Sequence, residues 1–252
     1  MLDKNKIYLG DCFELMKEIP DKSVDCILTD PPYGITACKW DVKLDLDKMW
    51  VEFKRICNGN IVMFASQPFT TDLICSNRDM FRYELIWNKK QTKQPMLANV
   101  RFMKAHENIL VFYKLLKTFN PQKTKEVELS SKAGDVNYYD KRNKSNYSIH
   151  RGISKPREVN YEGRYITSIL NYTLVNGQNV HPTEKPIELI SVLIKAFTDE
   201  TQLVLDPFSG SGTTAIACHE LNRNFICIEK DPEYYKMSCD RLEKAKQQGR
   251  LL

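Results

Sequence analysis

The sequence lacks long hydrophobic runs, paired cysteines and clustered histidines, and each absence excludes a class of protein. No apolar stretch approaches the length of a membrane span, and the first residues lack the apolar core of a signal peptide, so we expect a cytoplasmic protein without a membrane segment. The 8 cysteines form no C-x-x-C pair, and the 4 histidines are scattered along the chain. We therefore predict free thiols in a reducing compartment and no bound metal.

Positive charge is concentrated in the middle of the chain. The net charge of the 252 residues is +5, but residues 82–157 alone hold 17 Lys or Arg against 6 Asp or Glu. A basic segment on a neutral to acidic body favours a polyanion such as nucleic acid as a partner. A solvated lysine-rich surface is the alternative interpretation of the same composition.

Short apolar runs alternate with segments of helical period over most of the chain. Runs bounded by turn residues predict strands near 6–11, 24–28, 61–65, 84–87, 108–113, 202–206 and 225–229. Helical spacing predicts helices near 12–19, 44–57, 68–80 and 186–197, another that ends at 221, and a last one near 232–247. This alternation is typical of an α/β protein with a doubly wound, mostly parallel sheet, here of seven strands.

Residues 115–180 show neither period. Asn, Lys, Ser and interleaved tyrosines dominate this stretch, which predicts an insertion into the α/β domain. Cations alternating with aromatic rings can follow phosphates and stack on bases, although a polar insertion with a small tyrosine-rich core has the same composition.

A carboxylate and two prolines follow the apolar run at 24–28. In Asp30-Pro31-Pro32-Tyr33 the prolines fix the backbone and remove two N–H donors, so the carbonyls of Asp30 and Pro31 are left to accept from another group. Loops at the carboxyl ends of strands carry the chemistry of open α/β sheets. A carboxylate, a carbonyl and an aromatic ring on one stiff loop predict a receptor for a planar amine.

A second loop has the layout of a nucleoside-cofactor site. Residues 202–229 read as a strand, a glycine-containing turn, a helix and a strand that ends on Glu229, which could bind both ribose hydroxyls. Gly210-Ser211-Gly212 is not the dinucleotide-binding fingerprint, and Asp206 would repel a pyrophosphate but suits a cationic amino-acid cofactor. A simple tight turn is the alternative.

Together, Asp30-Pro31-Pro32-Tyr33 and Asp206-Pro207-Phe208-Ser209-Gly210-Ser211-Gly212-Thr213 resemble the S-adenosylmethionine-dependent DNA amino-methyltransferases. The catalytic motif precedes the cofactor motif, as in the beta class of this family. The likeness extends to Gly10-Asp11, His106-Glu107, His181 to Pro186, and Glu229. It implies a catalytic half at 1–114, an inserted target-recognition region at 115–180 and a cofactor-binding half at 181–252 of one methyltransferase domain.

The resemblance implies S-adenosylmethionine as the cofactor. Glu229 would hold the ribose, Asp11 the adenine amino group, and Thr183 and Lys185 the methionine carboxylate. Asp11 could instead cap the helix from residue 12, and Lys185 could be an ordinary surface lysine. The implied cofactor residues are Asp11, Cys12, Thr183, Lys185, Asp206, Phe208, Ser209, Gly210, Gly212, Thr213 and Glu229.

The implied reaction is methylation of an exocyclic amine of a base flipped out of duplex DNA. Asp30 and the Pro31 carbonyl would accept the two amine N–H groups, and Tyr33 would stack on the base; Phe64 and Trp40 could stack as well but suit the core. The catalytic residues are thus Asp30, Pro31, Pro32 and Tyr33. An Asp-first motif resembles adenine-N6 enzymes. A cytosine-N4 enzyme, an RNA methyltransferase and an inactive DNA-binding relative are the alternatives, and a nicotinamide oxidoreductase leaves the Asp-Pro-Pro-Tyr loop unexplained.

Duplex DNA is the expected partner. We expect phosphate contacts from Lys89, Lys90, Lys93, Arg101 and Lys104, and base reading by Arg142, Arg151, Lys155 and Arg157. Relatives of the beta class often form homodimers. No nuclease motif is visible, so restriction would need a separate endonuclease.

Overall fold

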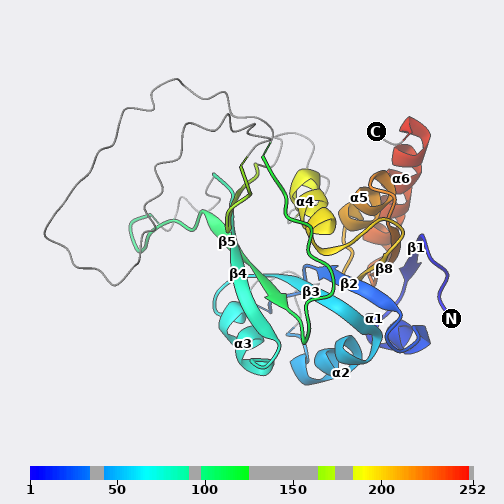
Figure 1. Ribbon diagram of the computed structural model, residues 1–252, viewed down its shortest axis with the longest axis horizontal. Helices are drawn as coiled ribbons and strands as arrows, with labels where there is room; N and C mark the ends of the chain where they lie inside the picture. Colours follow the sequence, from blue (N-terminus) through cyan, green and yellow to red (C-terminus); the bar gives the residue numbers. More distant parts are fainter. Residues whose placement is uncertain (35–42, 91–97, 125–163, 174–183, 250–252) are drawn as a thin grey trace, which may run out of the picture. The chain divides into compact units, whose positions relative to one another are not determined.

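The computed structural model describes residues 1–34, 43–90, 98–124, 164–173 and 184–249 (Figure 1). The chain forms two compact units, Met1–Gln122 with Thr167–Leu252, and Lys123–Ile166. In the smaller unit the described residues contain one antiparallel bridge, between Lys123 and Tyr165. The smaller unit spans fewer residues than the insertion expected at 115–180, because the residues on both sides of Lys123–Ile166 belong to the main unit.

The main unit alternates strands with helices much as the hydrophobic pattern predicts. The strands are β1 (Lys6–Leu9), β2 (Val24–Thr29), β3 (Cys57–Ala65), β4 (Phe81–Asn88), β5 (His106–Phe112), β6 (Ile169–Asn171), β7 (Leu203–Asp206) and β8 (Asn224–Glu229). The helices are α1 (Cys12–Leu15), followed by a 3-10 turn (Met16–Glu18), α2 (Leu46–Ile56), α3 (Phe69–Ser76), α4 (Ile187–Phe197), α5 (Thr213–Glu220) and α6 (Pro232–Gln248).

Within the described residues, the strands form one sheet of eight, in the order β1-β8-β7-β2-β3-β5-β4-β6. All neighbours are parallel except β5, which is antiparallel to β3 and β4. The expected count of seven strands was wrong by one, because β6 lies inside the stretch interpreted as patternless. β6 has three residues of which one is buried, too few to give an alternating signal.

Helices cover both faces of this sheet, as expected for a doubly wound domain. In Figure 1, α1, α2 and α3 lie on one face and α4, α5 and α6 on the other. Helix α2 shows how the sequence specifies this packing: Asp45 caps it by accepting from the Lys48 N–H, and its buried residues have helical spacing. They join the main hydrophobic core, and are Met49, Trp50, Phe53 and Ile56.

The strand order brings the two motif loops together. Strand β2 pairs with β7, in the register Cys26 to Val204 and Ile27 to Leu205, although the two strands are far apart in sequence. The chain winds outward from this pair in opposite directions, so β2 and β7 flank the switch point at which open α/β sheets bind ligands. Among the described residues, no helix is long and apolar enough to span a membrane.

Candidate active site

A cavity of about 850 Å³ lies at the carboxyl edge of the strands around this switch point. Its wall includes the whole Asp30–Tyr33 loop, which follows β2. It also includes most of the glycine loop, residues 207–212, which joins β7 to α5. Neighbouring strands contribute Asp11 after β1 and Glu229 at the end of β8. Antiparallel β5 enters at the same edge, because Asn108 pairs with Ala65 at the end of β3, and so Glu107 also lines the cavity.

The Asp30 carboxylate is held from two sides. The Tyr33 hydroxyl donates to Asp30 Oδ1 at 2.6 Å, and the Lys185 ammonium donates to Oδ2. The Tyr33 ring is stacked on Phe69, with centroids 5.2 Å apart and planes at 22°. The Asp30–Tyr33 loop is therefore fixed by its two prolines, by the stacking of Tyr33 on Phe69 and by the buried Lys185 ammonium.

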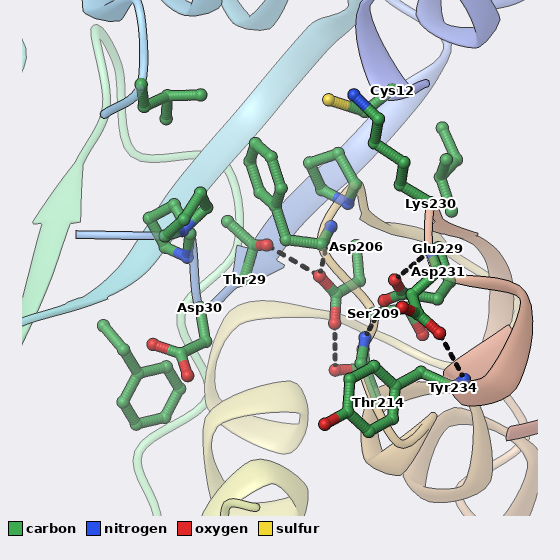
Figure 2. A pocket seen from close by; sticks show the side chains of 18 of the residues that line it. Cys12, Thr29, Asp30, Asp206, Ser209, Thr214, Glu229, Lys230, Asp231 and Tyr234 are labelled. Carbon is green, nitrogen blue, oxygen red and sulfur yellow. Dashed lines mark hydrogen bonds between the residues drawn. The ribbon is translucent and has the colours of Figure 1, made fainter. Parts of the chain in front are cut away.

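Asp206 lies deep in the cavity wall, between two threonines (Figure 2). The hydroxyls of Thr29 and Thr214 donate to its two oxygens at 2.6 Å each, and the Phe208 N–H donates to Oδ1 at 3.2 Å. Burial raises the pKa of Asp206 to about 6, although the two threonine hydroxyls act to lower it. The carboxylate is thus held in place by three donors, and it takes up a proton at a higher pH than an ordinary aspartate.

Glu229 anchors the glycine loop. Its two oxygens accept from the N–H groups of Gly210, at 2.7 Å, and Asp231, at 2.8 Å, and burial raises its pKa. Gly212 begins α5 in the left-handed region, at φ +78°, and a Cβ added there would lie 2.7 Å from the Cβ of Ser238. Gly212 itself is outside the cavity wall and shapes the loop through this turn.

Asp11 caps the N-terminus of α1, which was the alternative to a contact with the adenine of the cofactor. Its Oδ1 accepts from the Phe13 N–H at 2.9 Å, and its Oδ2 lies 3.2 Å from the ammonium of Lys230. It still lines the cavity, as does the adjacent Cys12. Burial raises the pKa of the Cys12 thiol to about 12, so this group is a neutral part of the wall.

Lys185 is far from an ordinary surface lysine, since its side chain is 8% exposed. Its ammonium contacts Asp30, lies 3.6 Å from Glu107 Oε2, and sits 5.0 Å from the ring centroid of Phe64. Burial lowers the pKa of Lys185, but Asp30 and Glu107 outweigh burial and the net shift is upward. This ammonium is therefore engaged with the Asp30 carboxylate, whereas the family resemblance implied a contact with the methionine carboxylate.

The cavity collects most of the predicted site residues. All four catalytic candidates line it, and so do the cofactor candidates Asp11, Cys12, Lys185, Asp206, Phe208, Ser209, Gly210, Thr213 and Glu229. Thr183 lies outside the described residues, as do Trp40 and the DNA candidates Lys93, Arg142, Arg151, Lys155 and Arg157. The remaining DNA candidates lie in the segment that connects β4 to β5. Lys89 contacts Glu107 and Lys104 contacts Ser66, both in the cavity wall, whereas Lys90 and Arg101 are exposed.

Several lining residues were not identified from sequence. Thr29 and Thr214 were missed because a threonine at a strand or helix end carries no chemical signal until its partner is known. Phe13 and Tyr234 were missed because they lie on helices to which the sequence assigned no function, and Lys230 was missed because it lies in the turn between β8 and α6. Lys230 could have been predicted from its position, because it directly follows Glu229, the acid at the end of its strand.

The residues present fit an adenosylated amino acid. Glu229 and Asp206 supply acceptors, a left-handed glycine turn lets backbone approach a ligand, and the rings of Phe13, Phe208 and Tyr234 supply apolar and stacking surface. Within the described residues, no group of His, Cys, Asp and Glu could hold a metal ion.

Comparisons with known proteins identify relatives of this chain. The chain is 30% identical over 260 residues to the type II methyltransferase M1.MboII of Moraxella bovis, across 93% of this chain and 95% of the relative. It is 30% identical over 253 residues to the DNA adenine methyltransferase YhdJ of Escherichia coli (strain K12), across 94% of this chain and 82% of that protein.

Solved structures share the fold over nearly the whole chain. The M1.HpyAVI–SAM complex matches with a TM-score of 0.63 at 26% identity, over 94% of this chain and 99% of that one. The cytosine-N4-specific PvuII DNA methyltransferase matches in fold with a TM-score of 0.65 at 18% identity, over 96% and 90% of the two chains. Residues 24–240 match the N6/N4 methyltransferase family, described as DNA methylase. The chain therefore belongs to this family of S-adenosylmethionine-dependent DNA methyltransferases.

Proposed function

We propose that the protein methylates the N6 amine of an adenine flipped out of duplex DNA, at a specific sequence. The observation that carries this proposal is the meeting of Asp30 and Pro31 with the glycine loop in one cavity. An amine acceptor and a cofactor site must be adjacent for direct methyl transfer, and the pairing of β2 with β7 makes them adjacent.

Asp30 and Pro31 orient the amine. The amine lone pair is delocalised into the base ring, so the nitrogen is a weak nucleophile until its N–H bonds are held. The Asp30 carboxylate and the Pro31 carbonyl accept these two bonds and turn the lone pair toward the cofactor side of the cavity. S-adenosylmethionine supplies an electrophilic methyl group on a sulfonium. Tyr33 steadies Asp30 through its hydroxyl and is the candidate stacking partner of the base.

The cofactor residues divide between the two ends of the ligand. Glu229 is placed for the ribose hydroxyls, because each of its oxygens already bonds one backbone N–H and retains a further lone pair. Asp206 would meet the ammonium end, Asp11 and Cys12 would meet the adenine, and Phe208 would supply an apolar wall; all four line the cavity. The loop residues Ser209, Gly210, Gly212 and Thr213 give the backbone its course, and Thr183 and Lys185 complete the set assigned by resemblance.

Adenine is favoured over cytosine by the motif and by relatives. The motif begins with Asp, as in adenine-N6 enzymes, and YhdJ, at 30% identity, is a DNA adenine methyltransferase. The cytosine-N4-specific relative of known structure is 18% identical and shares the fold. Cytosine-N4 methylation is the second candidate, because the same loop can hold either amine.

Duplex DNA would be bound by the basic segment of the chain, with a homodimer and a separate endonuclease as further partners. Lys90 and Arg101 are exposed and suited to phosphate contact. Lys89 and Lys104 turn inward to Glu107 and Ser66, which places their charges at the cavity wall.

Methyl transfer from labelled S-adenosylmethionine to unmethylated genomic DNA tests the reaction, with unlabelled RNA as competitor and nucleoside analysis of the product. We expect N6-methyladenine in DNA, undiminished by RNA. N4-methylcytosine would keep the mechanism and replace the base. Label in RNA would overturn the DNA assignment.

A further inference from the structure

A series of side-chain contacts with alternating charge runs from the Asp30–Tyr33 loop to the antiparallel part of the sheet. Asp30 contacts Lys185, Lys185 lies beside Glu107, and Glu107 contacts Lys89. The four side chains come from the loop after β2, the segment before α4, the start of β5 and the residue after β4. Two carboxylates and two ammonium groups therefore alternate within a largely buried cluster, with side-chain exposures of 8 to 26%, and the charge of Lys104 also acts on Glu107.

Lys185 is placed unequally between its two carboxylates. It donates to Asp30 Oδ2, whereas Glu107 Oε2, 3.6 Å away, is beyond hydrogen-bond length. Among the described residues, Glu107 Oε2 is a buried oxygen without a hydrogen-bond partner. The other oxygen, Oε1, is held by Lys89. Glu107 thus has one oxygen anchored and the other aimed at the ammonium.

The Lys185 ammonium competes with an incoming amine for Asp30, because each oxygen of this carboxylate already accepts one hydrogen bond and retains a single further lone pair. Tyr33 bonds Oδ1 of Asp30 and Lys185 bonds Oδ2. If the buried Lys185 ammonium moved away from Asp30 and found no other acceptor, its charge would be unpaired, which is energetically very unfavourable. Glu107 Oε2 is such an acceptor and needs only a short movement of Lys185 to form the bond.

We propose that Glu107 is a positioning residue for methyl transfer: it receives the Lys185 ammonium when the target amine takes its place at Asp30. The proposal rests on the proposed role of Asp30 as the amine acceptor. Glu107 touches neither base nor cofactor in this role and acts through Lys185. Burial raises the pKa of Glu107, but Lys185 and Lys89 outweigh it and the pKa is lowered, so the receiving group is a carboxylate.

Glu107→Gln tests this role, because glutamine keeps the size of the side chain and removes the charge that receives Lys185. We expect the single-turnover rate of methyl transfer to fall between about tenfold and about 100-fold, with dissociation constants for S-adenosylmethionine and DNA within about threefold of wild type. Glu107→Asp should recover part of the rate. Glu84→Gln is the matched control: it lies on neighbouring β4, outside the cavity wall, and its Oε2 accepts from Asn108.

A second readout does not depend on turnover. Nitrogen-edited NMR of the lysine ammonium groups, with Lys185→Met to assign the signal, should show the Lys185 resonance moving when cofactor analogue and substrate DNA are added. The resonance should not move in Glu107→Gln. An unmoved signal in the wild type, or a Glu107→Gln rate equal to that of wild type, would overturn the proposal.

A structural role is distinguished by stability and binding. If Glu107→Gln lost rate only in proportion to a lowered melting temperature or weakened cofactor binding, the positioning role would be rejected. The rates are measured on whichever nucleic acid the wild type methylates, so a cytosine or RNA product would overturn the proposed substrate and leave the Glu107 comparison intact.

Discussion

Asp206 is a carboxylate removed from water, and in the part of the chain that the structure describes its hydrogen-bond donors are all uncharged. Its hydrogen bonds come from Thr29, Thr214 and the Phe208 N–H, and the burial that opposes them sets its pKa at about 6 against an ordinary value of 3.8. In the pH range between these values the folded protein holds a proton that the unfolded chain has released. Stability linked to Asp206 therefore falls as the pH rises from about 4 to about 6, by about 3 kcal/mol for the full shift.

Asp206→Asn removes this titration. We predict that the free energy of unfolding of the variant, relative to wild type, rises by about 3 kcal/mol between about pH 4 and about pH 6. Urea unfolding of both proteins at several pH values measures it. A difference that is the same at both ends of the range would show that Asp206 is not the titrating group.

Tyr33 combines two functions in one side chain, and substitutions separate them. Tyr33→Phe removes the hydroxyl that donates to Asp30 and retains the ring stacked on Phe69. We predict a fall in kcat of about tenfold for Tyr33→Phe and about 100-fold or more for Tyr33→Ala, because the ring also steadies the loop. Steady-state kinetics measures both. Equal losses would indicate that the hydroxyl carries the whole effect.

At the scale of elements, hydrophobic period predicts where most helices and strands lie. The helix expected at 44–57 is α2, Leu46–Ile56, and the strand expected at 225–229 is β8, Asn224–Glu229. Period does not give strand direction, so the antiparallel course of β5 had no signal in the sequence. That course matters, because it brings Glu107 to the cavity edge and gives Lys185 its second carboxylate.

Gly212 joins the glycine loop to α5 under two constraints. Its φ of +78° strains any side chain, and an added Cβ would meet Ser238 of α6 at 2.7 Å. We predict that Gly212→Ala lowers the free energy of unfolding by about 2 kcal/mol or more, since strain and a clash add.

Gly210→Ala is the matched control for the clash. Gly210 also has a positive φ, of +52°, but an added Cβ there meets nothing within 4 Å. Gly210→Ala should lower the free energy of unfolding by about 1 kcal/mol, because the substitution adds backbone strain without a clash. Denaturant unfolding compares the two, and an equal cost would mean that α6 yields to the added carbon.

At the scale of the whole molecule, the site arises from strands that are distant in sequence. Each loop could be interpreted alone, the first as an amine receptor and the second as a cofactor turn. Their adjacency depends on the pairing of β2 with β7, and no local pattern encodes that pairing. The family resemblance supplied it, because two motifs of one enzyme imply one site. Neither the local sequence pattern nor the family resemblance predicted the contacts that form only on folding, such as Asp206 with Thr29 and Lys185 with Asp30.

The charge of the whole molecule predicts how it binds DNA. Lys90 and Arg101 are exposed cations in the basic segment, on either side of residues 91–97. Replacing either with Gln should weaken DNA binding on all sequences and reduce the slope of log K against log salt by about one. Lys244→Gln, an exposed position on α6, is the control and should leave the slope unchanged. Titrations at several salt concentrations measure the slope, and an unchanged value for both variants would place the DNA elsewhere.

The central claim is that the Asp30 loop performs the transfer while the neighbouring loop holds the cofactor. Asp30→Ala separates these functions when cofactor binding and methyl transfer to DNA are measured on one preparation, with Asp240→Ala, an exposed site on α6, as control. We predict that Asp30→Ala binds S-adenosylmethionine within about threefold of wild type and loses transfer by about 1,000-fold or more. Transfer at the wild-type rate, or loss only in step with cofactor binding, would contradict the claim.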